Sequence, residues 1–128
     1  MSDRLPTIDL SEGRPFDALG APVRRLIHPN TVGSVGLGVS ICDMPPGSRV
    51  QRHRHDYEEA YFVISGHGTM YLEGVGDVAL RPDLLVYVAP GRGHGQVNDG
   101  DQPLRILCSL APPPVEGQAP ELLDGETA

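Results

Sequence analysis

Short apolar runs, each followed by turn-forming residues, dominate the middle of the chain. None of these stretches carries a helical apolar stripe across three turns. The runs are rich in Val, Ile, Leu and Tyr and are separated by turn sequences such as Pro-Pro-Gly and Asn-Asp-Gly. They lie at residues 35–44, 48–55, 60–65, 68–73, 77–81, 84–90, 95–98 and 103–111. This pattern predicts an all-β protein, built as an antiparallel β-barrel or jelly roll.

The two ends of the chain differ from this middle part. Residues 1–30 contain four prolines, which favours a surface segment with one edge strand at most. Residues 112–128 carry four acidic side chains, no basic ones and few apolar groups, so we expect a mobile, acidic, Pro-rich tail. A chain of 128 residues has no room for a second core, and the barrel is therefore expected over residues 31–111 as a single domain.

The charge of the chain and its lack of Lys argue against several classes of function. The net charge is -7, and all ten basic residues are Arg, so no Lys is present for Schiff-base chemistry or a phosphate cradle. An acidic chain without a basic stripe argues against nucleic acid or an anionic membrane as a partner. The first ten residues contain no apolar run long enough for a signal peptide, which leads us to expect a soluble, cytoplasmic protein.

The two cysteines lie in apolar surroundings, 66 positions apart in the sequence. Cys42 and Cys108 do not have the C-x-x-C spacing of a redox or zinc motif, and two cysteines alone do not make a disulfide framework. We expect both to be buried free thiols.

The stretch RHRH within residues 52–55 is the strongest chemical signal. In a β-strand His53 and His55 point to one face, while the arginines between and before them point to the other. Two unpaired imidazoles inside a barrel cost roughly 1–3 kcal/mol each, unless a shared cation satisfies them. After a short turn, Glu59 begins the next strand and can lie beside the two rings. Glu58 has the opposite parity and is expected in solvent.

A third histidine opens a later strand. His94, Gln96 and Asn98 share a face in the segment that follows the turn at residues 90–93. Antiparallel pairing with the RHRH strand brings His94 to the first two rings. Three imidazole nitrogens and one carboxylate oxygen suit a divalent transition metal such as Fe(II), Mn, Ni or Zn, and an octahedral ion keeps two positions for water or substrate.

The spacing of these residues resembles the first motif of the cupin superfamily. The chain reads Gly47-x5-His53-x-His55-x3-Glu59-x6-Gly66, which agrees with that motif at every defined position.

The second cupin motif is present in a modified form. Gly91, His94 and Asn98 agree with it, while Asp83 and Ala89 stand where Gly and Pro are usual. The departures affect turn geometry and leave the metal ligand in place. By resemblance, the protein is a small single-domain cupin whose metal is held by His53, His55, Glu59 and His94. Members of this family commonly form homodimers through their sheets.

Each of the other residues near this set has two possible roles. Tyr61 shares the face of Glu59 and is either a core tyrosine or a catalytic phenol that donates a hydrogen bond or, with a lowered pKa, acts as a base. Gln96 and Asn98 can orient ligands or substrate, although Asn98 also suits the junction between strand and loop. Arg105 either points outward, which is favoured, or lies inside and clamps a carboxylate.

Two histidines lie outside the set. His67, in the turn Ser-Gly-His-Gly, is expected in solvent. His28 precedes a proline in the N-terminal segment, and we favour a surface position for it over a place at the barrel mouth.

Three functions are compatible with such a site. The favoured one is a non-haem metal dioxygenase acting on a small, oxygen-bearing molecule, with Glu59 and Tyr61 as its catalytic residues besides the metal. The second is a non-redox isomerase, cyclase or lyase of a polyketide or aromatic pathway, in which the ion is a Lewis acid. The third is a non-catalytic cupin that binds a small ligand. The inward strand positions are mostly aliphatic, which predicts a pocket for an apolar-bodied substrate.

Overall fold

The protein consists of short strands in the part of the chain that the computed structural model describes, residues 6–114 and 119–123. One 3-10 helix, η1 (Leu10–Glu12), precedes them, so no helix described here is long and apolar enough to cross a membrane. The strands are β1 (Arg14–Ala18), β2 (Ala21–Ile27), β3 (Gly38–Met44), β4 (Arg49–Arg54), β5 (Glu58–Ser65), β6 (Gly68–Leu72), β7 (Gly76–Leu80), β8 (Leu85–Val88), β9 (His94–Val97), β10 (Leu104–Ala111) and β11 (Glu121–Leu122).

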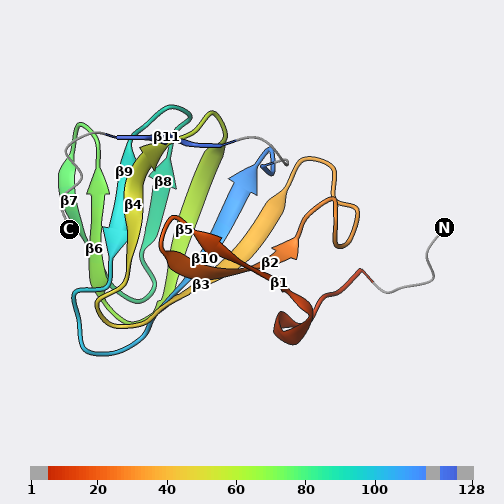
Figure 1. The fold of residues 1–128 in the computed structure, drawn as a ribbon, viewed down its shortest axis with the longest axis horizontal. Helices are drawn as coiled ribbons and strands as arrows, with labels where there is room; N and C mark the ends of the chain where they lie inside the picture. The colour runs from red at the N-terminus through yellow and green to blue at the C-terminus, as the bar shows by residue number, and fades with distance from the viewer. Residues whose placement is uncertain (1–5, 115–118, 124–128) are drawn as a thin grey trace.

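These strands form two antiparallel sheets that face each other (Figure 1). The six-stranded sheet has the order β1-β2-β3-β10-β5-β8, and the five-stranded sheet has the order β11-β4-β9-β6-β7. Strands distant in sequence are therefore neighbours, as in β3 with β10 and β4 with β9. This arrangement is a jelly roll and confirms the predicted all-β fold.

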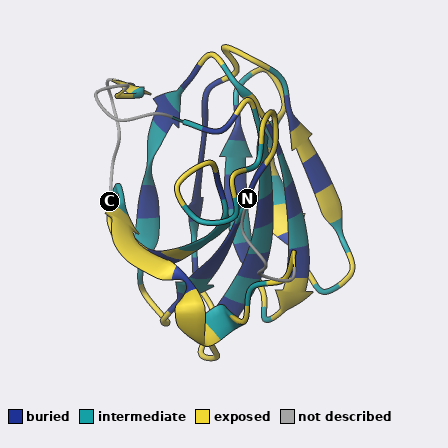
Figure 2. Ribbon diagram, turned by 90° about the vertical axis from the view of Figure 1, so that its right-hand side faces the viewer, coloured by how far each residue is buried: buried dark blue, intermediate teal, exposed yellow. Residues whose placement is uncertain are grey.

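The core fills the space between the sheets, because strands such as β6 and β8 turn every second residue inward, where it is buried (Figure 2). Burial of each large apolar side chain stabilises the fold by roughly 1.5–3 kcal/mol. Both cysteines belong to this core as free thiols, as predicted. The largest apolar side chains that are completely buried are Met44, Val63, Met70, Leu80, Val88, Leu104 and Ile106.

The N-terminal segment contains more structure than its prolines suggested. It contributes two strands rather than one at most, joined by a tight turn in which Leu19 and Gly20 both have positive φ. Strand β2 then pairs with β3 and extends the six-stranded sheet. Pro15 and Pro22 are tolerated because Pro15 lies on the edge strand β1 and Pro22 lies before Val23, where the pairing of β2 with β3 begins, so neither has to donate an N–H to β3.

Part of the predicted mobile tail lies against the barrel. Strand β11 pairs with β4, so that Leu122 is opposite His53. Residues 115–118 and 124–128, on which the rest of this prediction falls, lie outside the described residues. The C-terminal segment therefore contacts the strand that carries the first two histidines.

Candidate metal centre

Strands β4 and β9 place three imidazoles side by side inside the barrel. His53 is the direct cross-strand partner of His94, and His55 follows on the same face as His53. The ring centroids are 4.3 Å apart for His53 and His94 and 4.8 Å apart for His55 and His94. All three side chains are buried, and one ligand nitrogen from each lies within 4.8 Å of the others. Three imidazoles in this arrangement could hold a metal ion.

Each of the three rings is oriented by a hydrogen bond to a backbone carbonyl. The Nδ1 atoms of His53, His55 and His94 lie 2.7, 2.9 and 3.0 Å from the carbonyl oxygens of residues 51, 57 and 92. A carbonyl oxygen only accepts, so each Nδ1 donates its proton there and each Nε2 is the atom left to bind a metal. The Nε2 atom of His94 is buried without a partner among the described residues. A transition metal fits this donor set, because it would satisfy the lone pairs that the rings present.

Glu59 approaches the same point from the opposite sheet, on β5. Its Oε1 lies 3.1 Å from Nε2 of His55 and 3.8 Å from Nε2 of His94. Burial alone raises the pKa of Glu59, but the adjacent His55 and His94 outweigh burial, and the pKa of Glu59 lies below its ordinary value. Glu59 is therefore an anion, and the predicted fourth ligand lies beside two of the three rings. Glu58 is exposed, as expected.

The buried position of His53 keeps its ring neutral. Burial first, and then the neighbouring His94, lower the pKa of His53 to about 4. A neutral imidazole is the form that binds a metal, so near pH 7 this ring is ready to coordinate without releasing a proton.

Two tyrosines flank the imidazoles, and only one was anticipated. Tyr61 is buried, and its ring centroid lies 5.9 Å from that of His94. Burial and the charge of Glu59 raise its pKa well above the ordinary value, so the phenol remains a hydrogen-bond donor and the base interpretation is not supported. Tyr57 stacks on His55 with centroids 3.7 Å apart and planes 7° from parallel. Its only sequence signal was its place two residues after His55, in the turn before Glu59.

Of the remaining predicted site residues, Gln96 lines the cavity, whereas Asn98 and Arg105 do not. Gln96 lines the cavity beside the imidazoles, and its Oε1 is buried without a partner among the described residues. Asn98 donates from Nδ2 to the carbonyls of Met44 and Gln102, which places it at the junction between strand and loop.

Arg105 does not reach the site. Its Nε and Nη2 donate to the Asp43 carboxylate over 2.7 and 3.1 Å, and both side chains are partly exposed.

The two histidines outside the set behave differently from each other. His67 is exposed, as expected. The surface position favoured for His28 is wrong: the side chain is 4% exposed and lines the cavity. Its Nδ1 accepts from the amide of Asn30 over 3.0 Å, and its Nε2 donates to the carbonyl of Pro114 over 2.9 Å. These bonds fix His28 as a neutral ring that ties the chain after β10 to the barrel mouth.

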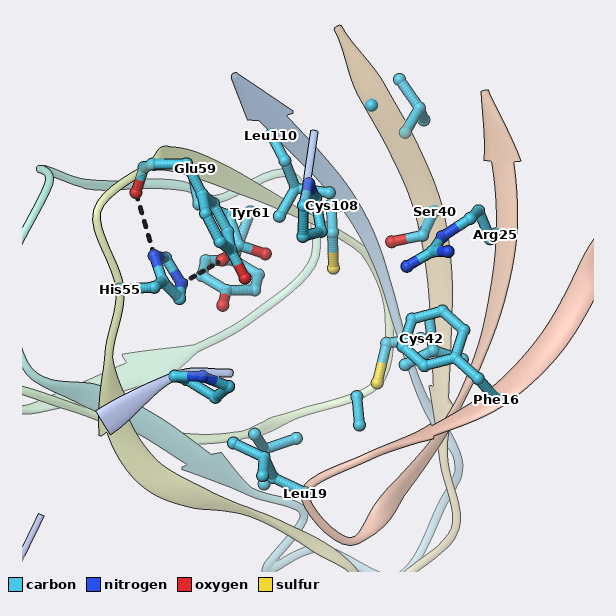
Figure 3. A pocket seen from close by; sticks show the side chains of 18 of the residues that line it. Phe16, Leu19, Arg25, Ser40, Cys42, His55, Glu59, Tyr61, Cys108 and Leu110 are labelled. Carbon is cyan, nitrogen blue, oxygen red and sulfur yellow. Dashed lines mark hydrogen bonds and ion pairs between the residues drawn. The ribbon is translucent and has the colours of Figure 1, made fainter. Parts of the chain in front are cut away.

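A cavity of about 270 Å³ extends from the imidazoles between the two sheets (Figure 3). His55, Glu59 and Tyr61 lie at one side of it, and residues of β1, β2 and β3 lie at the other. Apolar side chains form most of the wall, in agreement with the predicted apolar pocket. The N-terminal hairpin was not expected here, yet it contributes Phe16, Leu19 and Val23 to the wall.

The site predicts a specific loss of metal. In His94→Ala, one of three converging nitrogens is removed, so we expect the metal content of the purified protein to fall at least about tenfold. Elemental analysis of the desalted protein measures it. His67→Ala, which removes an exposed ring far from the set, is the matched control and should keep the wild-type content. Equal metal content in both variants would contradict the assignment.

Stability of the metal-free protein should depend on pH through His53. The unfolded ring titrates near pH 6.5 and the folded ring near pH 4, so between these values the unfolded chain binds more protons. The free energy of unfolding therefore falls as pH falls through this window, by on the order of 2–3 kcal/mol from this group. Urea unfolding in the presence of a chelator at pH 7.5 and 4.5 measures the change. His53→Gln lacks the titrating ring and should show a smaller change. The same change in both proteins would refute this cause.

Comparison with known proteins finds relatives of the same architecture. The uncharacterized protein MJ1618 of Methanocaldococcus jannaschii is 34% identical over 95 residues, which are 73% of this chain and 75% of that protein. Polyketide synthase CurC of Streptomyces cyaneus is 31% identical over 125 residues, which are 91% of this chain and 80% of that protein. In fold, the chain is similar to the polyketide cyclase RemF from Streptomyces resistomycificus, with a TM-score of 0.76 at 18% identity, over 98% of this chain and 89% of that one.

A family model described as a cupin domain, Cupin_2, matches residues 40–110. The matched segment includes His53, His55, Glu59 and His94, and it covers more than half of the chain. The protein is therefore a member of the cupin family, with a single domain and three histidines that could bind a metal.

Proposed function

We propose that this cupin is a metal-dependent enzyme that cyclises or isomerises a small, apolar-bodied substrate through its carbonyl or enol oxygens. The observation that carries the proposal is the convergence of three Nε2 lone pairs at the inner side of a largely apolar cavity. The similarity to CurC, a polyketide synthase protein, and to the fold of RemF, a polyketide cyclase, supports a substrate of polyketide type.

The roles of the residues follow from their positions. His53, His55 and His94 would hold the ion, with Glu59 as fourth ligand because its Oε1 already lies beside two of the rings. A divalent ion bound there supplies Lewis acidity towards an oxygen of the substrate. Glu59 is also the anion within reach of a substrate proton, while the protonated Tyr61 can donate a hydrogen bond to a developing oxyanion. The apolar walls limit the access of water.

A dioxygenase, which the sequence favoured, is the second candidate. The same three imidazoles and one carboxylate suit Fe(II) as well as a non-redox ion, and the largely apolar cavity suits either reaction. We favour the cyclase because the chain is similar to CurC, a polyketide synthase protein, and in fold to RemF, a polyketide cyclase.

Solvent exchange and oxygen consumption distinguish the two reactions. The metal-loaded protein, incubated with a panel of 2-acylphenols and diketones in D₂O, should accelerate exchange of the α-hydrogens without consuming O₂. NMR and an oxygen electrode measure the two quantities. Glu59→Gln, which keeps the shape of the side chain but removes its charge, should lower the exchange rate by about 10²–10⁴-fold. Stoichiometric O₂ uptake with an iron-loaded protein would instead favour the dioxygenase.

We also propose that the chain forms a homodimer through the outer face of the six-stranded sheet. Leu85 is 67% exposed and Tyr87 58% exposed on the edge strand β8. Leu85 begins an outward-facing cross-strand row that continues through Phe62 and Leu107, both partly exposed, and ends at Ile41, which is already buried. Such a continuous apolar row favours burial against a second copy.

Light scattering coupled to gel filtration tests the homodimer. The wild-type protein should elute with about twice the chain mass of 13.7 kDa. Leu85→Asp introduces a charge into the row and should shift the mass to that of one chain. Val75→Asp, at an equally exposed apolar residue in a turn outside the row, should leave it unchanged. A wild-type protein with the mass of a single chain would disprove the dimer.

A further inference from the structure

The cavity has a second polar pole, opposite the imidazoles, and Arg25 forms it. Figure 3 shows the guanidinium of Arg25 next to Ser40, across the cavity from His55 and Glu59. The pairing of strands explains this position. Arg25 on β2 is opposite Ser40 on β3, which is opposite Cys108 on β10, which is opposite Tyr61 on β5. These four side chains form one row across the inner face of the six-stranded sheet.

Strand alternation explains how an arginine comes to face inward. Val23 on β2 is buried and Arg24 is exposed, so Arg25 returns to the inner face, opposite Ser40. The register between β2 and β3 shifts only after Arg25, where Ile27 pairs with Val39. The carbon of the guanidinium lies 4.9 Å from the centre of the Phe16 ring, which supports it through a cation–π contact.

Arg25 lacks a counterion within residues 6–114 and 119–123. Its guanidinium contacts Phe16 there and forms no ion pair, whereas Arg54 and Arg105 pair with Glu73 and Asp43. A half-buried guanidinium without an anion is costly, and this one faces a cavity.

The acidic residues that line the same cavity are engaged elsewhere. Asp17 accepts from the amide of Gly20 over 3.1 Å, within its own hairpin, and Glu59 lies against the imidazoles. His28, the other basic residue in this part of the wall, is fixed as a neutral ring by its two hydrogen bonds. The only cationic group at this pole, among the described residues, is therefore Arg25, and no anion of the wall neutralises it.

We propose that Arg25 determines specificity by binding an anionic group, a carboxylate in the first place, on the substrate whose reactive oxygens lie at the three histidines. A planar guanidinium recognises a carboxylate through paired hydrogen bonds, and the Ser40 hydroxyl lies next to it as a further donor. This inference rests on the proposed function for the reactive end of the substrate and deepens it. The substrate class is an aromatic or polyketide-like acid with chelating oxygens at one end and a carboxylate at the other.

The sheet limits the length of such a substrate. Three strand-to-strand steps separate Arg25 from Tyr61, and each is about 4.8 Å, so their backbones lie roughly 14 Å apart. The side chains at both ends shorten this span, which leaves room for one or two fused rings between the carboxylate and the reactive oxygens.

The binding of 2-naphthoate, compared with its neutral analogue 2-naphthamide, tests Arg25 directly. Both probes are titrated into metal-free protein, and naphthalene fluorescence reports binding without interference because the chain has no Trp. The wild-type protein should bind the carboxylate at least about tenfold more tightly than the amide. In Arg25→Gln this preference should disappear while the affinity for the amide stays the same. Arg25→Lys keeps the charge without the planar fork and should retain part of the preference.

Arg24→Gln is the matched control. It makes the same substitution one position away, on the exposed outer face of β2, and should preserve the wild-type preference. The inference is overturned if the wild-type protein binds 2-naphthoate no better than 2-naphthamide, including the case in which it binds neither. It is equally overturned if Arg24→Gln removes the preference as fully as Arg25→Gln.

A second titration separates this inference from the proposed function. Metal-loaded protein is titrated with 6,7-dihydroxy-2-naphthoate, which combines a chelating catechol with a distant carboxylate, and with 2,3-dihydroxynaphthalene, which has the catechol alone. We expect His94→Ala to weaken both probes and Arg25→Gln to weaken only the first. If the catechol binds through His94 but the carboxylate adds nothing, Arg25 is excluded while the metal site stands. If the naphthoate preference holds but His94→Ala changes neither probe, the metal-dependent function fails and the anion site stands.

Discussion

The pairing of β4 with β9 is the constraint on which the rest of the site depends. It places His53 opposite His94, and three backbone carbonyls then fix the rings by accepting their Nδ1 protons. With that side of each ring occupied, the Nε2 atoms face the interior and each other. Such an arrangement leaves lone pairs in a buried space, where an unpaired polar atom is costly. The backbone therefore arranges three imidazoles that could hold a cation.

Sequence reasoning succeeded where the geometry is local. The two-residue period of a strand was enough to predict that His53 and His55 face inward and that Glu58 does not. It also identified Glu59 and Tyr61 as residues of one face, both of which are buried. The place of His94 needed more than periodicity, because its partner lies some forty residues earlier; the cupin-like spacing supplied that information.

Sequence reasoning failed where the position of a side chain depends on a partner that is distant in the sequence. Arg105 was a candidate for a carboxylate clamp, but the register of β10 against β3 places it beside Asp43, with which it pairs. The chemistry expected of Arg105 instead suits Arg25, which no local pattern singled out. His28 was missed for the same reason, because the carbonyl that holds it belongs to Pro114, 86 residues later. Prolines in the first 30 residues concealed β2, which carries Arg25 and ends just before His28.

The two sheets thus contribute different polar residues to the cavity. The five-stranded sheet provides the three imidazoles, while the six-stranded sheet provides Glu59 near them and Arg25 far from them. The segment that matches the cupin family, residues 40–110, contains the side chains that could hold a metal and begins after β1 and β2. The family match therefore includes the imidazole end of the cavity and does not include the end lined by β1 and β2. The N-terminal hairpin pairs with β3, and its turn also reaches β4, where the amide of Gln51 donates to the carbonyl of Leu19 over 3.0 Å. The backbone of the hairpin is therefore held against the strand that carries His53, while its cavity-facing side chains shape the far end of the cavity.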